Sequence, residues 1–573
     1  MNKLLWIAFT LLLSLPVSGQ GYTNLYEKNQ TLSYSQLVNA YKILDEKSDQ
    51  MKLLSYGASD GGNPLQILVI NKDKNFSPPA KNRKSETIIL IMNGIHPGES
   101  EGIDASLLFA QQLAIGKIEI PAHTTICILP IYNIDGMLNR KRFTRTNQNG
   151  PEEKGFRGSA CNYDLNRDFL KADSKNTFAF YQIFHQWDPD VFIDNHTSNG
   201  ADYQYIMTLI STQQQKLGGN SAAYLFNTMN PFLYSDMDKK GFDMVPYVNI
   251  WGKSPDEEGY EVFIETPKYS TGYTALFGTL SFVAETHMLK PYPQRVVATF
   301  ELMKTILEFT KNHGNEIRVA RLSDQNTYRN DRIYESNFVV DKEKSVKLAF
   351  KGFEAEKIPS KLGSYNRTYY NRSRPYTKEI NYYNTCKADL KIELPKAYVI
   401  PQAWAQVITR LKANNIELKR LNQDTSIACI AYYIMNTESG NRPYEGHHVN
   451  AKTQIETRKQ TIVFHKGDYL AFTNQTGNRY LAEVLEPQTE DGFFSWNFFD
   501  PILNQKEGFS DYVFEDDAVE LLAKDSLLQT KFTNWKLANP EKAKSSYDVL
   551  NFIFLNSPHY EAEHKRFPIF KIE

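Results

Sequence analysis

A histidine and a glutamate lie close together in the segment Asn93-Gly94-Ile95-His96-Pro97-Gly98-Glu99, directly after an apolar run at 88–92. The apolar run predicts a buried strand, and the Pro-Gly pair favours a tight turn at its carboxyl end. An imidazole and a carboxylate in such a turn could bind one metal ion. A surface histidine beside a helix-capping glutamate gives the same pattern, so His96 and Glu99 do not identify a zinc site by themselves.

A second histidine, His196, follows the apolar run at 191–193 and is the candidate for a third ligand. Neighbouring strands of an α/β sheet bring their carboxyl ends together, and such sheets bind ligands there. Two histidines and one glutamate leave one zinc position open for water, as catalysis requires. Taken alone, His196 could equally be a structural histidine that is hydrogen-bonded at the end of a strand.

A further carboxylate, Glu285, follows the apolar run at 280–284 and is the candidate general base for a zinc-activated water. Burying a glutamate at the end of a strand is costly, which favours a partner there, although a structural salt bridge would also provide one. His287 shares a strand face with Glu285. We expect His287 to pack around the site or to lie exposed at the surface rather than to bind zinc.

Two polar stretches between the ligands, 139–147 and 162–169, are rich in arginine and asparagine. Arginine suits both carboxylates and oxyanions. In a zinc hydrolase, one guanidinium could stabilise the tetrahedral oxyanion, while another could hold a terminal carboxylate together with a neighbouring amide. For the run at 140–145, solvated surface charge is the alternative.

Up to residue 315, strand-like and helix-like runs alternate along the sequence. Strand-like runs are found at 86–92, 124–131, 190–194 and 280–284, and helix-like runs at 99–113, 178–187 and 295–312. This alternation predicts an α/β fold. The sequence turns polar at 313–315, which predicts a catalytic domain at 20–315.

The remaining residues, 316–573, differ in character and predict a C-terminal accessory region of mixed α+β structure, made of one or two parts. This region has a Tyr- and Arg-rich patch at 365–383, short strand-like segments, and a helix-like stretch near 400–411. The aromatic cluster at 493–499 favours a packed core or a domain seam over a ligand groove. Nothing in this half alone indicates a function.

Composition and the N-terminal residues limit the possible partners and location. The 573 residues include 65 Lys+Arg and 66 Asp+Glu, a formal net charge of -1 that gives no electrostatic case for nucleic acid. Lys3, the apolar run at 4–15 and Gly19 predict a signal peptide at 1–19. Because the run is shorter than the ~20 residues of a membrane-spanning helix, we expect a secreted or periplasmic protein with no span after signal removal. An uncleaved anchor is the alternative.

Taken in order, these residues resemble the M14 zinc carboxypeptidase family, the metallocarboxypeptidases. The resemblance covers the α/β half and includes Asn133-Ile134-Asp135-Gly136, which is similar to the family's N-P-D-G turn. It implies one Zn²⁺ per chain, bound by His96, Glu99 and His196, and a mixed sheet flanked by helices. It also implies roles for six further residues: Glu285 as general base, Arg145 for the oxyanion, Asn166 and Arg167 for the substrate carboxylate, and Tyr269 or Tyr273 as the mobile tyrosine over the substrate. Arg142 is a rival for the role of Arg145.

The activity implied by the resemblance is hydrolysis of the C-terminal peptide bond of peptides or proteins. The His-Pro-Gly-Glu form and the long C-terminal half depart from the digestive branch of the family, so no side-chain preference is implied. A zinc amidohydrolase acting on cell-wall peptides or N-acyl amino acids would use the same residues. A degenerate secreted binding protein is the alternative from outside the enzymes. The sequence leaves the oligomeric state open.

Overall fold

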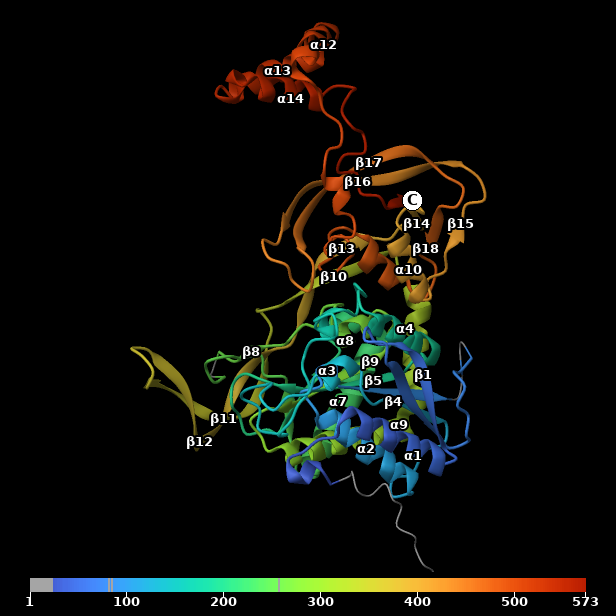
Figure 1. Cartoon of the computed structure of the whole chain (residues 1–573), viewed down its shortest axis with the longest axis vertical. Coiled ribbons are helices and arrows are strands. Elements are labelled where there is room, and N and C mark those ends of the chain that lie inside the picture. Colours follow the sequence, from blue (N-terminus) through green and yellow to red (C-terminus); the bar gives the residue numbers. More distant parts are fainter. Residues whose placement is uncertain (1–23, 81–82, 84–85, 256–257) are drawn as a thin grey trace, which may run out of the picture. The chain divides into compact units, whose positions relative to one another are not determined.

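The computed structural model describes residues 24–80, 83, 86–255 and 258–573 (Figure 1). The signal peptide predicted at 1–19 lies outside the described residues. Within the described ranges, no helix has both the length and the apolar character needed to cross a membrane.

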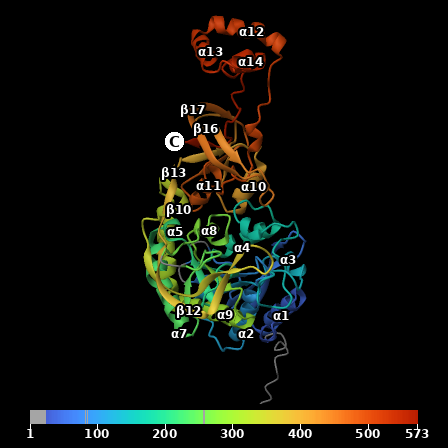
Figure 2. The same cartoon turned by 90° about the vertical axis from the view of Figure 1, so that its left-hand side faces the viewer.

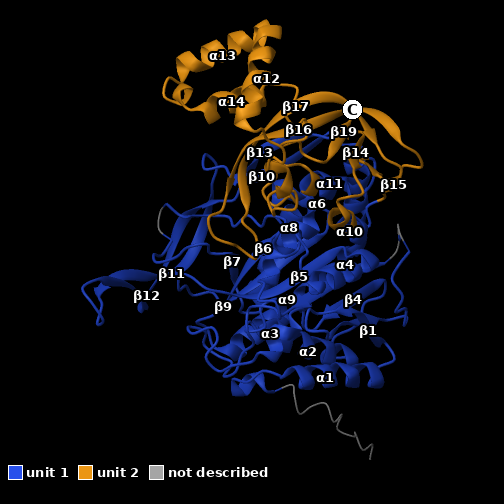
Figure 3. Ribbon diagram, turned by 45° about the horizontal axis from the view of Figure 1, so that its top comes forward, with its two compact units in different colours: residues 1–394, 410–416, 474–483 blue, residues 395–409, 417–473, 484–573 orange. Residues whose placement is uncertain are grey.

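The chain divides into two compact units (Figure 3). Unit 1 consists of Met1–Leu394, Arg410–Ile416 and Asn474–Glu483, and unit 2 of Pro395–Thr409, Glu417–Thr473 and Val484–Glu573. Unit 1 thus continues beyond residue 315, where the sequence predicted a boundary. Helix α9 (Tyr292–Tyr328) passes through this position without a break, and a Cβ at Gly314 would lie 2.4 Å from Thr87 Oγ1. Gly314 therefore allows close packing against the sheet and does not end the helix.

An eight-stranded mixed sheet forms the centre of unit 1, in the order β1-β2-β4-β3-β5-β9-β6-β7. Its strands are β1 (Met51–Ala58), β2 (Pro64–Asn71), β3 (Thr87–Asn93), β4 (Thr124–Leu129), β5 (Val191–Ser198), β6 (Met207–Ser211), β7 (Met244–Pro246) and β9 (Leu280–His287). The four central strands β4, β3, β5 and β9 run parallel. Strands β3, β4 and β5 are buried along their whole length, which explains their continuous apolar runs.

Helices cover both faces of this sheet. α2 (Glu101–Ala114) and α9 lie on one side, and α4 (Lys175–Trp187) and α8 (Ser270–Ala275) on the other (Figures 1 and 2). The remaining helices of this part are α1 (Tyr34–Lys47), α3 (Ile134–Leu138), α5 (Gln214–Leu217), α6 (Gly219–Tyr224) and α7 (Asn230–Lys239). The predicted α/β fold, a mixed sheet flanked by helices, is confirmed.

Residues beyond 315 complete unit 1. β11 (Val346–Pro359) and β12 (Asn366–Tyr383) form a long hairpin that pairs with β8 (Tyr260–Glu261), and β10 (Ile333–Val340) pairs with β13 (Cys386–Glu393). The segment 410–416 also contributes to the interior of this unit. Its Asn414 accepts a hydrogen bond from the Tyr273 hydroxyl and donates one to the Tyr480 hydroxyl at 3.0 Å.

Unit 2 contains a six-stranded sheet in the order β15-β18-β14-β19-β16-β17. Its strands are β14 (Ala397–Ile400), β15 (Lys419–Arg420), β16 (Thr425–Ser439), β17 (Asn450–Phe464), β18 (Tyr469–Phe472) and β19 (Phe570–Ile572). Helices α12 (Asp511–Lys524), α13 (Ser526–Ala538) and α14 (Ser546–Leu555) share a separate apolar core. α10 (Ala405–Ala413) and α11 (Asn478–Leu485) contribute residues to both units. The aromatic cluster at 493–499 is largely buried and packs on Phe567.

Candidate active site

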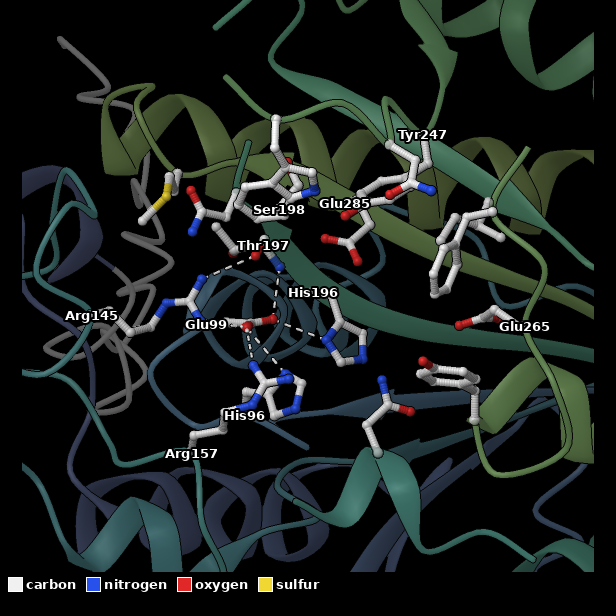
Figure 4. A pocket seen from close by; sticks show the side chains of 18 of the residues that line it. His96, Glu99, Arg145, Arg157, His196, Thr197, Ser198, Tyr247, Glu265 and Glu285 are labelled. Carbon is white, nitrogen blue, oxygen red and sulfur yellow. Dashed lines mark hydrogen bonds and ion pairs between the residues drawn. The ribbon is translucent and has the colours of Figure 1, made fainter. Parts of the chain in front are cut away.

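The three predicted zinc ligands come together at the carboxyl ends of β3 and β5. His96 and Glu99 lie in the turn between β3 and α2, and His196 lies within β5, which extends to Ser198. One ligand atom from each residue lies within 4.8 Å of the others. His96 Nδ1 is 3.1 Å from Glu99 Oε1, and His196 Nδ1 is 2.9 Å from Glu99 Oε2 (Figure 4). All three side chains are buried.

The outer nitrogen of each histidine faces a carboxylate. His96 Nε2 lies 2.9 Å from Asp164 Oδ1, and His196 Nε2 lies 3.0 Å from Asp194 Oδ2. Asp194 and His196 share one face of β5 because side chains alternate along a strand. Carboxylates in this position orient metal-binding imidazoles and raise the basicity of the inner nitrogen. Two imidazole nitrogens and one carboxylate, each held in this way, fit zinc.

A cavity of about 650 Å³ opens over these ligands. Among the predicted site residues, those that line the cavity are His96, Glu99, Arg145, Asn166, Arg167, His196, Tyr269 and Glu285. They come from segments far apart in the sequence, and the fold brings them together. Of the site residues named in advance, Tyr273 does not line the cavity.

Glu285 lies within β9 and is paired with His196 in the register of the two parallel strands. Its Oε2 is buried and has no hydrogen-bond partner among the described residues. Burial raises the pKa of Glu285 to about 8, and the neighbouring Glu99 adds to this effect while His196 opposes it. A carboxylate in this environment can hold a proton near neutral pH, which is what a general base must do after it has taken one.

Arg145 reaches the ligand cluster from the loop after α3. Its Nη1 donates to Glu99 Oε1 at 2.6 Å, and its Nη2 donates to the Thr197 carbonyl oxygen at 3.1 Å. Burial raises the pKa of the Glu99 carboxyl, but Arg145 and His96 outweigh this and hold it well below its usual range. The rival Arg142 is exposed and is not among the residues that line the cavity.

Gly98 allows Arg145 to come this close. A Cβ at Gly98 would lie 2.7 Å from Arg145 Cδ and 2.9 Å from the Gly155 carbonyl oxygen. Both distances are shorter than real side chains tolerate, so any larger residue would displace the arginine or the backbone. The glycine of the His-Pro-Gly-Glu segment therefore serves the approach of Arg145 as well as the turn.

Asn166 and Arg167 lie in a short 3-10 helix, Leu165–Arg167. The Asp164 side chain caps this helix by accepting a hydrogen bond from the backbone N–H of Asn166 at 3.0 Å. The Arg167 guanidinium lies over the Tyr269 ring, 4.5 Å from its centroid. Tyr273 is fully buried instead, and its hydroxyl lies 3.0 Å from His185 Nε2. Of the two tyrosines, only Tyr269 is in a position to contact a bound substrate.

The Asn133–Gly136 turn supports the site from behind. The Asn133 side chain accepts from the Gly136 amide at 2.8 Å and donates to the carbonyl oxygens of Ile95, at 3.3 Å, and Arg157, at 2.9 Å. It therefore ties the residue before His96 to the loop that follows Arg145. Asp135 of the same turn accepts from the Ser59 hydroxyl at 2.9 Å.

Several residues of the site were not predicted. Arg157 lies 2.9 Å from Asp164 and 3.7 Å from Glu99, and Glu265, Tyr247 and Trp251 line the cavity. The sequence did contain a signal for Asp164, because this carboxylate lies two residues before Asn166, a predicted substrate-binding residue. The others lie in irregular segments, where no apolar run points to them.

The hairpin β11–β12 braces one wall of the cavity. Lys357 Nζ and Thr368 Oγ1 both donate to the Gly252 carbonyl oxygen, at 3.2 and 2.9 Å. The Tyr370 hydroxyl donates to the Lys253 carbonyl oxygen at 3.0 Å. The neighbouring Trp251 lines the cavity. Residues well beyond 315 thus help to shape the site.

Among solved structures, the chain is similar to a metallo-carboxypeptidase from Burkholderia cenocepacia, with 15% identity, a TM-score of 0.36, and 49% of this chain and 70% of that chain covered. It is also similar to carboxypeptidase A from Helicoverpa armigera, with 14% identity, a TM-score of 0.38, and 51% and 75% covered.

The sequence comparisons are more specific. Residues 39–216 match the model of the zinc carboxypeptidase family. Carboxypeptidase 2 of Trichophyton rubrum is 21% identical over 461 residues, covering 76% of this chain and 78% of the relative, and carboxypeptidase 2 of Trichophyton tonsurans is 21% identical over 465 residues with the same coverage. The resemblance to zinc carboxypeptidases is confirmed. The chain is thus an enzyme similar to the metallocarboxypeptidases.

Proposed function

We propose that this chain is a secreted carboxypeptidase that removes C-terminal residues from peptides or proteins and binds one zinc ion per chain. The observation that carries the proposal is the convergence of His96, Glu99 and His196 with Glu285 in one cavity that also contains Asn166 and Arg167. The three ligands would hold the zinc. When bound there, zinc supplies Lewis acidity, which polarises a carbonyl group and makes a water molecule more acidic.

Glu285 acts as the general base. It takes a proton from the attacking water and returns it to the leaving amine. The free Oε2 and the raised pKa of this buried carboxyl support the role, because the group can hold the proton between the two transfers. Its place within β9 keeps the carboxylate close to His196 throughout the cycle.

Two arginines on the cavity wall bind negative charges of the substrate. One charge develops on the oxyanion during the reaction, and the other is the α-carboxylate, which is charged throughout. Arg145 stabilises the tetrahedral oxyanion, since a preorganised guanidinium beside the ligands is strongest where charge develops. Asn166 and Arg167 hold the free α-carboxylate of the substrate by charge-assisted hydrogen bonds. Requiring this carboxylate restricts cleavage to the last peptide bond. Tyr269, stacked on Arg167, covers the bound residue.

Secretion is part of the proposal and rests on the sequence of residues 1–19. The charged start, the short apolar run and Gly19 are typical of a cleaved signal peptide. N-terminal sequencing of the exported protein would test it, and a mature chain that begins at Gln20 is expected.

The activity is tested with matched peptides that differ only in having a free or an amidated C-terminus. The mature enzyme is incubated with both sets, with and without a zinc chelator, and the products are read by mass spectrometry. We expect loss of single C-terminal residues from the free-acid peptides only, and no loss with the chelator. Release of internal fragments, or equal cleavage of the amidated set, would reject the carboxypeptidase proposal. In that case, cell-wall peptides and N-acyl amino acids become the substrates to test.

A further inference from the structure

Arg145, the residue proposed to bind the oxyanion, lies in a loop rather than on a strand or helix. Its backbone has a φ of +53°, in the left-handed region that residues with a side chain rarely adopt. Such a conformation persists where the surrounding contacts hold it. An arginine side chain also has many rotamers to lose. The position of the guanidinium therefore depends on the groups that it contacts.

Two groups besides Glu99 hold this guanidinium. Arg145 Nη2 donates to the Thr197 carbonyl oxygen at 3.1 Å (Figure 4), and Arg145 Nε donates to Gln148 Oε1. The side-chain amide of Gln148 donates in turn to the carbonyl oxygen of Gly150 at 2.9 Å. Thr197 and Gln148 are both buried. The arginine thus depends on a strand residue and on a residue of its own loop.

A buried ion pair connects these two groups. Glu101 Oε1 lies 2.6 Å from Arg295 Nε, and the two side chains are 1% and 0% exposed. Glu101 Oε2 accepts a hydrogen bond from Thr197 Oγ1 at 2.5 Å, and Arg295 Nη2 donates to the Gly150 carbonyl oxygen at 2.8 Å. The contacts therefore close a ring, which runs from Arg145 through Thr197, Glu101, Arg295 and the segment 148–150 back to Arg145.

Arg295 also holds the end of a central strand. Its Nη1 donates to the carbonyl oxygens of Met288 at 2.7 Å and Lys290 at 3.1 Å, directly after β9. Apolar side chains of similar size could replace a buried ion pair without loss of stability, so stability alone is a weak explanation for the pair. The directed hydrogen bonds of the guanidinium fix the strand that carries Glu285 relative to the loop that carries Arg145.

We propose that Glu101 and Arg295 are positioning residues, which hold Arg145 at the place where the oxyanion forms. The inference rests on the proposed function, because it assumes that Arg145 binds this oxyanion. Neither Glu101 nor Arg295 is among the residues that line the cavity, so both act through Thr197 and Gly150. A preorganised donor stabilises developing charge most effectively, since it does not reorganise during the reaction. Loosening the pair therefore weakens binding of the transition state rather than binding of the substrate.

Steady-state kinetics of Glu101→Gln on a free-acid peptide test this role. The variant keeps the shape of the side chain and leaves Arg295 without its charged partner. We expect kcat to fall by about 10- to 100-fold. KM should change by less than about threefold, because the affected interaction is made only in the transition state. Unchanged kcat, or a loss confined to KM, would overturn the proposal.

A double-mutant cycle shows whether Glu101 acts through Arg145. Arg145→Ala alone should lower kcat by about 10²–10³-fold. Adding Glu101→Gln to Arg145→Ala should lower kcat by less than about threefold more, because the effects of residues that share one interaction are not additive. Two losses that multiply in full would show that Glu101 acts independently of Arg145, and the proposal would fail.

Asp190→Asn makes the same chemical change in a matched ion pair. Asp190 Oδ1 lies 3.1 Å from Arg321 Nη1, and these side chains are 1% and 3% exposed. Asp190 precedes β5, whereas His196 lies near the other end of that strand. Both Asp190→Asn and Glu101→Gln should lower the free energy of unfolding in urea, but only Glu101→Gln should lower kcat. Equal losses of kcat in both variants would make the role of Glu101 merely structural.

A milder variant covers the case in which Glu101→Gln does not fold. Thr197→Val keeps the backbone contacts of Thr197 with Glu99 and Arg145 and removes the hydroxyl that binds Glu101. It should lower kcat by about 3- to 10-fold with KM unchanged. Wild-type kcat in Thr197→Val would contradict the proposal.

Crystal structures of the wild type and of Glu101→Gln, or of Thr197→Val in its place, separate this inference from the proposed function. The distance to compare is the one from Arg145 Nη2 to the Thr197 carbonyl oxygen, which is 3.1 Å here. A guanidinium displaced by about 1 Å or more in the variant would support the positioning role even if neither protein hydrolysed a peptide. In that case the carboxypeptidase proposal alone would fail. An unmoved Arg145 would overturn the role of the pair, whether or not peptides are hydrolysed.

Discussion

Glu285 and His196 are paired in the register of the parallel strands β9 and β5, so their side chains leave the same face of the sheet. The candidate base and a candidate metal ligand are therefore spaced by the sheet itself rather than by a loop. Sites built on strands are held more precisely than sites built on loops. The relationship explains why both residues follow apolar runs in the sequence.

The first prediction concerns Glu285. Glu285→Gln should keep its zinc and lose about 10²–10⁴-fold of kcat, since the amide cannot accept the proton. Zinc content by elemental analysis and kcat on a free-acid peptide measure the two effects. Turnover close to that of the wild type would remove Glu285 from the mechanism.

A second prediction concerns the carboxylate behind His96. Asp164→Asn weakens the orienting contact at 2.9 Å, so zinc affinity should fall by about 10- to 100-fold. Competition with a chromophoric chelator measures the affinity. Asp238→Asn, on an exposed side chain of α7, is the matched control and should not change it. Unchanged affinity in Asp164→Asn would show that Asp164 serves only the loop.

The third prediction tests the close approach at Gly98. Gly98→Ala places a methyl group 2.7 Å from Arg145 Cδ, so the guanidinium must move. A misplacement of about 1 Å in an active site can cost up to about 100-fold in rate, and we expect kcat to fall on this scale. Gly508→Ala, which meets nothing within 4 Å, is the control. A crystal structure of Gly98→Ala with Arg145 in its original place would contradict the explanation.

The fourth prediction concerns stability in acid. Burial lowers the pKa of His185 to about 4, below the 6.5 expected in the unfolded chain. Between these values the unfolded chain binds the additional proton, so stability falls as the pH decreases from 6.5 to 4. His185→Gln removes this contribution. Over that pH range, the free energy of unfolding of the variant should therefore fall by about 1–2 kcal/mol less than that of the wild type. This figure is discounted for solvent screening, because the side chain is half-buried. Urea unfolding at pH 7 and pH 4.5 provides the comparison, and parallel losses in both proteins would refute it.

The fifth prediction concerns the hairpin that braces the cavity wall. Lys357→Met combined with Thr368→Val removes two hydrogen bonds to the Gly252 carbonyl oxygen, each of roughly 1 kcal/mol. The part of the cavity wall that contains Trp251 should become more mobile. KM should therefore rise by up to about tenfold, while the zinc content stays unchanged. Lys361→Met changes an exposed residue of the same hairpin and serves as the control. An unaltered KM in the double variant would show that the wall holds without the hairpin.

The sequence was most informative where polar residues follow apolar runs. His96, His196 and Glu285 each follow a run that forms a central strand, and the common edge of a parallel sheet then predicts their meeting. The strands β5 and β9 extend further than predicted, because backbone pairing continues through the polar residues at their ends. The ligand cluster was therefore predictable from local pattern and topology together.

Glu265 and Arg157 show where this reasoning stops. Neither follows a periodic segment, and their places depend on how loops close over the sheet, which is decided by contacts distant in sequence. Gly314 shows the same limit for the boundary at 315. A polar His-Gly-Asn stretch is typical of a turn, but packing against Thr87 keeps it helical.

The return of the chain to unit 1 at Asn414 and Tyr480 has a consequence for biosynthesis. The hydroxyl of Tyr273, deep in the catalytic unit, is bonded to Asn414, which in turn binds Tyr480. Synthesis proceeds from the N-terminus, so a chain still on the ribosome lacks this last part of the interior until Tyr480 has been added. Domains generally fold as units once their residues are available. Completion of this unit is thereby delayed until the segment that contains Tyr480 has been synthesised and has left the ribosome.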